Sequence, residues 1–179
     1  SNEAAAELMT EVARDNDRFL GEAARVNGAA YLTVSLLSTE DPSIPESRKE
    51  LAVEEAALTD VTGPAAWSVP SYPDIRPSIQ PVIEGAAGLG FPNVVVDSDG
   101  VRRRIDLLGR YEGNYFGQLV FMPLLDLLGN PAVTVTADEI LLDGALHPDE
   151  EERRRIAIPR AEDGSLLIHW PKATFLESF

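Results

Sequence analysis

The first third of the chain shows three clear patterns of apolar and polar residues. Apolar residues recur every three or four positions over residues 3–27, which predicts a helix, with a break near residues 15–17, where Asn and Asp favour caps. Residues 30–37 alternate between apolar and polar side chains, as a strand with one buried face would. Residues 46–59 are acidic with apolar positions between the charges, which predicts a second helix.

Prolines dominate the segment between residues 64 and 81. Five prolines fix the backbone and remove hydrogen-bond donors there, so the sequence predicts no regular element. Trp67, Tyr72 and Arg76 lie among these prolines and are candidate ligand-binding residues. Long irregular segments often carry function, and the alternative is a surface strap that covers the edge of the core.

The rest of the chain is rich in hairpin signals. Asp-Gly pairs, which favour tight turns, occur at residues 99–100, 143–144 and 163–164. The apolar pattern around them predicts helices over 79–87 and 115–128, the second kinked at Pro123, and strands over 91–97, 101–110, 132–136, 140–142, 155–158 and 166–170. We therefore expect an α/β fold, a mixed, largely antiparallel sheet with flanking helices, in a single domain over residues 1–179.

Charge and composition narrow the classes of function. Fifteen Lys and Arg stand against 30 Asp and Glu, and the formal net charge of −15 argues against nucleic acid or an anionic membrane surface as a partner. The chain has no cysteine, which suits a compartment outside the cytoplasm. No apolar run approaches about 20 residues, so no membrane span is expected within the chain. Its acidic start and abrupt aromatic end are interpreted as those of a fragment of a longer protein.

Familiar catalytic motifs are missing from the sequence. The two histidines, His147 and His169, form no metal-binding pair, and neither a Gly-x-Ser-x-Gly motif nor a phosphate-binding loop occurs. The glycines of residues 85–90 follow a predicted helix and precede a strand, the reverse of the dinucleotide fingerprint. The acidic run at residues 97–100 would place Val95 at the first ligand position of a calcium loop, so a hairpin turn is preferred. We expect no cofactor and no metal.

Arg103 is the most unusual residue of the predicted strand that follows this turn. Alternation places it on the same face as Val101, Ile105 and Leu107, so its guanidinium should be buried. A buried guanidinium needs a carboxylate, backbone carbonyls or a bound anion. A structural ion pair is the preferred interpretation, and an anchor for an anionic ligand is the alternative.

The passage from residue 90 to residue 103 resembles the type-two CHASE domain, a sensory domain of bacterial cyclases and histidine kinases. The pattern G-F-x-N-x-x-x-D-x-D-G-x-x-R of that family is matched by Gly90, Phe91, Asn93, Asp97, Asp99, Gly100 and Arg103. The passage from Ile158 to Trp170 is similar to the closing hairpin of the family. The resemblance covers about residues 17–179, and the additional opening strand and helices of the family are not found.

This resemblance implies a sensor outside the cytoplasm, tethered by transmembrane helices of the parent protein. Such a domain would respond to a small-molecule or protein signal, regulate an adenylate or guanylate cyclase or a histidine kinase, and work as a homodimer.

Two alternatives stay open. One is a soluble α/β enzyme built on Asp97, Asp99, Arg103 and His169, which requires these residues to converge in a cleft. The other is an interaction module that binds a protein partner through the proline-rich segment at residues 64–81.

Overall fold

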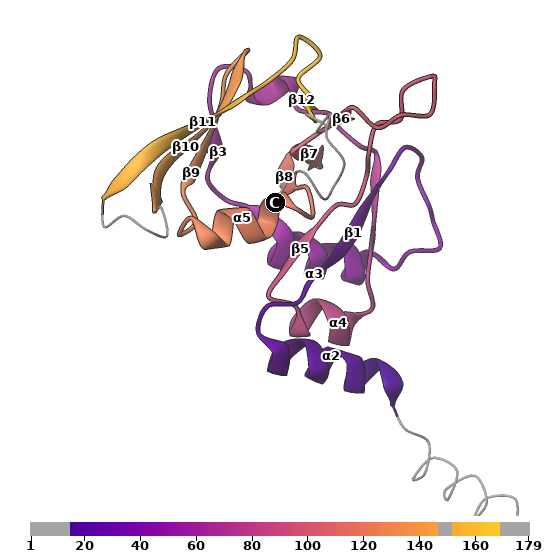
Figure 1. Ribbon diagram of the computed structural model, residues 1–179. Coiled ribbons are helices and arrows are strands. Elements are labelled where there is room, and N and C mark those ends of the chain that lie inside the picture. The colour runs from indigo at the N-terminus through magenta and orange to yellow at the C-terminus, as the bar shows by residue number, and fades with distance from the viewer. Residues whose placement is uncertain (1–14, 147–151, 169–179) are drawn as a thin grey trace, which may run out of the picture.

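The computed structural model describes residues 15–146 and 152–168 (Figure 1). In chain order the elements are α2 (Asn16–Asn27), β1 (Tyr31–Leu37), α3 (Glu46–Ala56), β2 (Ala57–Leu58), β3 (Val61–Thr62), the 3-10 turn η1 (Ala66–Ser68), β4 (Asp74–Pro77), α4 (Gln80–Gly85), β5 (Gly88–Gly90), β6 (Arg104–Ile105), β7 (Leu108–Tyr111), β8 (Asn114–Gly117), α5 (Phe121–Leu127), β9 (Ala132–Val135), β10 (Glu139–Leu146), β11 (Arg153–Pro159) and β12 (Leu166–Leu167).

The described strands form four small sheets. The first has the order β4-β1-β5, in which β1 pairs antiparallel with β4 and parallel with β5. The second has the order β11-β10-β9-β3 and is antiparallel except for the pair β3–β9. The sheets β2-β8-β7 and β12-β6 are antiparallel throughout. The predicted α/β class with mixed, largely antiparallel pairing is therefore confirmed.

The first and the second sheet each contribute to a separate hydrophobic core. The first core gathers around β1 and α3 and includes the buried side chains of Val34, Leu36, Ile75, Phe91 and Phe116. The second lies between α5 and the sheet of β9 and β10 and includes Phe121, Leu125, Val133, Val135 and Leu142. Val34 and Leu36 are buried as the alternation over residues 30–37 predicts.

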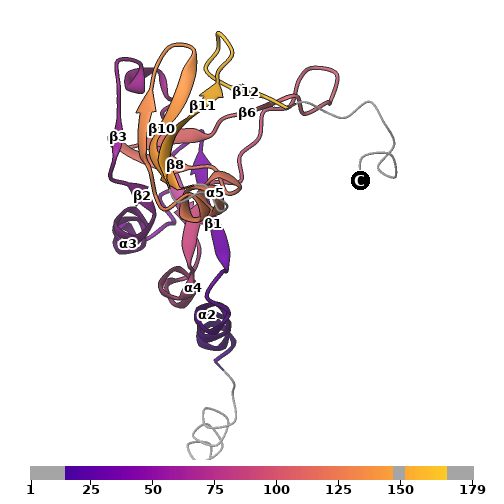
Figure 2. The ribbon, with the colours of Figure 1, turned by 60° about the vertical axis from the view of Figure 1, so that its left-hand side comes forward.

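Three helices form a column beside the first sheet (Figure 2). Helix α3 packs on α4, and α4 packs on α2. The contact between α2 and α4 is close, because a Cβ atom on Gly21 would lie 2.1 Å from the carbonyl oxygen of Pro81. A Cβ atom on Gly85 would likewise lie 2.1 Å from the carbonyl oxygen of Gly21. Glycine at both positions lets the two backbones touch.

The described part of the predicted N-terminal helix begins and ends at signals in the sequence. Asp15 caps α2 by accepting a hydrogen bond from the Arg18 amide, and Gly28 ends it with a φ of 70°. Residues 3–14 of that prediction lie outside the described residues. Phe19 and Leu20 belong to the predicted apolar stripe, yet both are more than half exposed, because α2 packs backbone to backbone through its smallest side chains.

The prediction of an irregular segment over residues 64–81 is wrong in part. The 3-10 turn η1 and the strand β4 both lie within it, and β4 pairs with β1. Pro77 is tolerated because it ends a strand at the edge of the sheet, where a missing N–H breaks no ladder. Proline density excludes a central strand but not an edge strand.

Two predicted elements of the second half are also wrong. No strand forms over residues 91–97, and the three valines 94–96 are between 38% and 51% exposed. The predicted helix over residues 115–128 is instead strand β8 followed by helix α5, which begins only at Phe121. Pro123 is the third residue of α5, where a missing N–H leaves no helical bond unmade, so no kink is required.

The three Asp-Gly pairs have different outcomes. Residues 97–101 and 161–165 form tight turns as predicted, closed by backbone hydrogen bonds. Residues 143–144 do not form a turn but a bulge within β10, where the register shifts between Leu142 and Ala145 and Gly144 has a φ of 79°. The predicted strand over residues 101–110 is divided into β6 and β7, whereas the next three predicted strands are present as β9 to β11. Of the predicted strand over 166–170, β12 covers residues 166–167, and residues 169–170 lie outside the described residues.

Candidate functional site

The turn at residues 97–103 brings three predicted site residues together. Nη1 of Arg103 donates to Asp97 Oδ2 at 3.0 Å and to Asp99 Oδ1 at 2.9 Å, and its Nη2 donates to Asp99 Oδ2 at 2.7 Å. The Arg103 side chain is 46% exposed. Its predicted burial is wrong because the regular strand that would have buried it does not form. The ion pair of the preferred interpretation is present, on an exposed side chain, and the alternative of an anchor for an anionic ligand stays a prediction.

The ion pair with Arg103 keeps the Asp99 carboxylate ionised. The hydrogen bond from Arg103, followed by that from the Val101 amide, lowers the pKa of Asp99 to about 2. Arg104 extends the cluster by pairing with Asp163 in the last turn of the described chain. The cluster therefore holds an exposed turn against β6, and does not line the ligand-sized hollows described below.

The enzyme alternative required these residues to converge in a cleft with His169. Asp97, Asp99 and Arg103 converge on one another, but on the surface of a turn. His147 and His169 lie outside the described residues. The enzyme alternative accordingly stays a prediction, because these three side chains meet on a turn and the fourth residue, His169, is not described.

The candidates from the proline-rich segment have different surroundings. Tyr72 is half-buried against the first core, and burial raises its pKa. Arg76 is exposed on β4 and donates to Asp41 Oδ2 at 2.8 Å. Trp67 lies in η1, and its side chain is not among the described ones. No described contact joins Tyr72, Arg76 and Arg103 into one site.

Sequence reasoning missed a buried ion pair beneath α3. Asp74, the first residue of β4, is 1% exposed and accepts a hydrogen bond from Lys49 Nζ at 2.7 Å. The amides of Asp41 and Ile75 donate to the same carboxylate at 2.7 and 2.8 Å. Burial by itself would raise the pKa of Asp74, but Lys49 and the two amides together lower it. This pair fixes the inner face of α3 against the first sheet.

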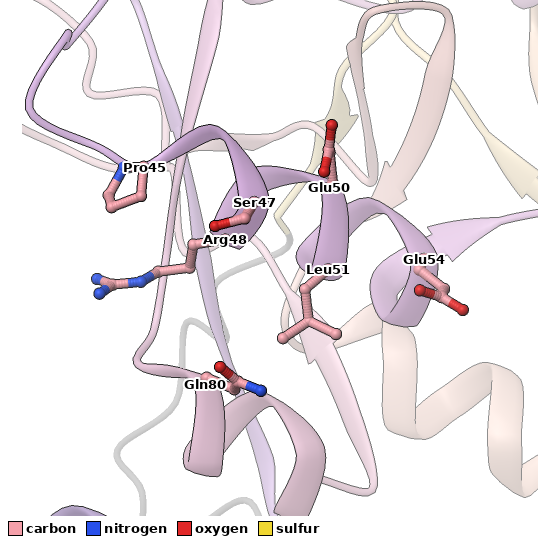
Figure 3. Close-up of a pocket in the computed structure, with 7 residues that line it drawn as sticks. All are labelled: Pro45, Ser47, Arg48, Glu50, Leu51, Glu54 and Gln80. Atoms are coloured by element: carbon pink, nitrogen blue, oxygen red, sulfur yellow. The ribbon is translucent and has the colours of Figure 1, made fainter.

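Two neighbouring hollows lie on the outer side of α3. The Gln80 hollow has a volume of about 460 Å³ and is lined by Pro45, Ser47, Arg48, Glu50, Leu51, Glu54 and Gln80 (Figure 3). The Tyr111 hollow has a volume of about 270 Å³ and is lined by Glu46, Lys49, Glu50, Val53, Glu54, Tyr111 and Glu112. Their linings share Glu50 and Glu54, so one helix forms a wall of both. None of these residues was a candidate in the sequence.

Side chains that bind metals do not cluster in the described part of the chain. Within residues 15–146 and 152–168, no three His, Cys, Asp or Glu side chains gather closely enough to hold a metal.

The helices described for those residues include none with the length and hydropathy needed to cross a membrane.

Comparisons with known proteins return no match. No family model, no curated protein and no solved structure matches this chain. The resemblance to the type-two CHASE domain therefore stays a prediction, and the candidate site rests on the geometry of α3 and its neighbours.

Proposed function

We propose that this chain is the extracytoplasmic signal-input domain of a membrane-bound signalling protein. It senses a small molecule or protein signal and regulates an adenylate or guanylate cyclase or a histidine kinase. The observation that carries the proposal is the helix column, since α3 forms a wall of both hollows and connects through α4 to α2 (Figures 1 and 2).

The column offers a mechanical route from a bound ligand to the N-terminal helix. Gln80, the first residue of α4, lines the Gln80 hollow together with α3. Gly85, the last residue of α4, touches the backbone of Gly21 in α2. Close-packed backbones cannot absorb a displacement, so a ligand that shifts α3 against α4 also shifts α2. Preferential binding to one arrangement would then change the population of α2 positions.

The exposed surface of α2 supports a homodimer, the state proposed for this receptor. Phe19, Leu20 and Val26 are 54%, 55% and 86% exposed. Phe19, Ala23 and Val26 follow one stripe at the spacing of a helix-pairing seam, and Ala23 is exposed as well. A second copy of α2 would cover this stripe and bring the two outputs together. Chemical cross-linking of the purified chain tests this pairing.

Two experiments test the sensor proposal. The parent reading frame should encode an apolar run of about 20 residues beside this segment and an output domain beyond it. A stop codon directly after residue 179 with no upstream apolar run would overturn the proposal.

The compartment is tested by labelling. The chain has no cysteine, so a Ser98→Cys substitution on the exposed turn gives the segment a single thiol. A membrane-impermeant maleimide added to intact cells, or to cells with a permeabilised outer envelope, should label the parent protein there. Labelling that appears only after the cytoplasmic membrane is broken would contradict an extracytoplasmic position.

A further inference from the structure

We infer that the Tyr111 hollow binds a small organic ammonium ion. The claim that this ion is the physiological signal rests on the proposed function, whereas the binding itself does not. Charge, an unsatisfied hydroxyl group and the shape of the hollow point to the same class of ligand.

Carboxylates surround the hollow on two sides. Glu46, Glu50 and Glu54 lie four residues apart along α3 and so share one face of the helix, while Glu112 approaches from the β7–β8 turn. The cation of the lining, Lys49, is already paired with Asp74 at 2.7 Å and lies 3.5 Å from Glu46. The hollow therefore presents an excess of negative charge that favours a cation over an anion.

Tyr111 supplies the second, independent observation. Its side chain is only 3% exposed, and its hydroxyl has no hydrogen-bond partner among the described residues. No fully sealed side-chain oxygen of the described residues lacks a partner, so this hydroxyl reaches the surface of the hollow that Tyr111 lines. Burial and then the Glu112 carboxylate raise the pKa of Tyr111, which keeps the hydroxyl neutral and able to accept an N–H bond. The hydroxyl therefore has an open hydrogen-bonding position at the hollow, which an N–H group of a ligand can occupy.

The walls of the hollow favour an organic cation. Val53 and the body of Tyr111 provide apolar and aromatic surface, which an alkylated ammonium group contacts favourably. The volume of about 270 Å³ is close to the lower limit of ordinary small-molecule pockets, roughly 300 Å³. The ligand should therefore be small, such as a short diamine or a quaternary amine.

The position of Glu112 is consistent with a role in binding. Glu112 and Gly113 form the two-residue turn between β7 and β8, with φ values of 47° and 81°. Such turns favour Asn, Asp or Gly where φ is positive, so glutamate is an unfavourable choice for the backbone. Glu112 instead contributes a negative charge to the lining of the hollow.

The inference is tested by calorimetric titration of the purified chain with tetramethylammonium chloride and with putrescine, at constant ionic strength. We expect saturable binding of both. Glu112→Gln should weaken both about five-fold, as expected for one rim charge. Tyr111→Phe should weaken putrescine about five-fold and leave tetramethylammonium within two-fold, because only putrescine has N–H groups to donate. The matched control Glu55→Gln removes a charge from α3 outside the lining and should change neither affinity more than two-fold.

Several outcomes would overturn the inference. One is the absence of saturable binding by either ion in the millimolar range. Another is an equal loss of affinity in Glu55→Gln and Glu112→Gln, which would mean a diffuse attraction to an acidic surface. If circular dichroism shows that Tyr111→Phe does not fold, the test is the difference in ammonium affinity between Glu112→Gln and Glu55→Gln. If neither ion binds but residue 98 is labelled outside the cytoplasm, the ammonium inference is wrong while the proposed sensor function is still supported.

Discussion

Replacing Gly21 with alanine tests the contact that joins α2 to the rest of the fold. In an isolated helix this substitution is favourable by about 1 kcal/mol, because glycine is a poor helix former. In this structure the new Cβ atom would lie 2.1 Å from the Pro81 carbonyl oxygen, whereas real Cβ atoms stay at least 3.0 Å away from their neighbours. The oxygen belongs to the backbone and cannot rotate aside, so α2 and α4 must separate.

The size of the effect follows from two opposing contributions. Forcing an extra methyl group into a packed contact costs about 1–3 kcal/mol, and a backbone neighbour favours the upper half of that range. Helix propensity offsets about 1 kcal/mol of this cost. We therefore expect the free energy of unfolding to fall by about 1–2 kcal/mol. For a chain of this length, that corresponds to a melting temperature lower by about 2–8 °C.

Urea unfolding followed by circular dichroism gives the free energy, and hydrogen exchange of the α2 amides locates the change. Leu20→Met is the control, because Leu20 is the neighbouring position, is 55% exposed and does not line the hollow between α2 and α4, and the change should alter stability by less than about 0.5 kcal/mol. A Gly21→Ala variant that is more stable than the original chain would refute the close contact. Unchanged exchange in α2 would remove the proposed route from the hollows to this helix.

Three further predictions concern single groups. Hydrogen bonds, first that from Ser43, lower the pKa of Asp41 from 3.8 to about 2. The ionised form of Asp41 therefore stabilises the fold above pH 3.8, and this contribution is lost as the pH falls to about 2. Asp41→Asn should make the urea midpoint less dependent on pH between these two values. The hydrogen bond to Asp126 raises the pKa of Tyr31 from 10.0 to about 12, so the contribution of Tyr31 to stability is present below pH 10 and lost as the pH rises to about 12. In an ultraviolet titration, Asp126→Asn should move this ionisation back toward pH 10, and an unmoved midpoint would contradict the assignment. Glu112→Asn should raise the free energy of unfolding by about 1 kcal/mol, because Asn tolerates a positive φ. The same substitution should weaken ammonium binding. Denaturation and calorimetry on the same sample show whether stability rises while affinity falls.

The candidate residues found from the sequence and those found from the structure differ in their separation along the chain. Asp97, Asp99 and Arg103 are close in the sequence, and the Asp-Gly signal located their turn, although the pairing of Arg103 with these two aspartates was not predicted. Tyr111 and the α3 side chains of its hollow are more than fifty residues apart in the sequence. They meet because β2, which directly follows α3, pairs with β8 and so brings the β7–β8 turn beside the helix. No local pattern in the sequence predicts the pairing of β2 with β8.

Features decided by a few neighbouring residues could be predicted from the sequence alone. Gly28 ends α2, the alternation over residues 30–37 selects the buried face of β1, and residues 161–165 turn at Asp163-Gly164. Each depends on the φ preference of a glycine or on the period of a strand, and neither requires knowledge of the rest of the fold.

Which apolar segments are buried was decided only by the tertiary structure. The valines at 94–96 have the pattern of a core strand but remain exposed, because the shorter segment Gly88–Gly90 occupies the place beside β1. Residues 115–117 were predicted as the start of a helix but belong to strand β8, which pairs with β2 and β7. The physical reason is that an apolar run gains free energy only where a complementary surface removes it from water, and distant parts of the chain supply that surface.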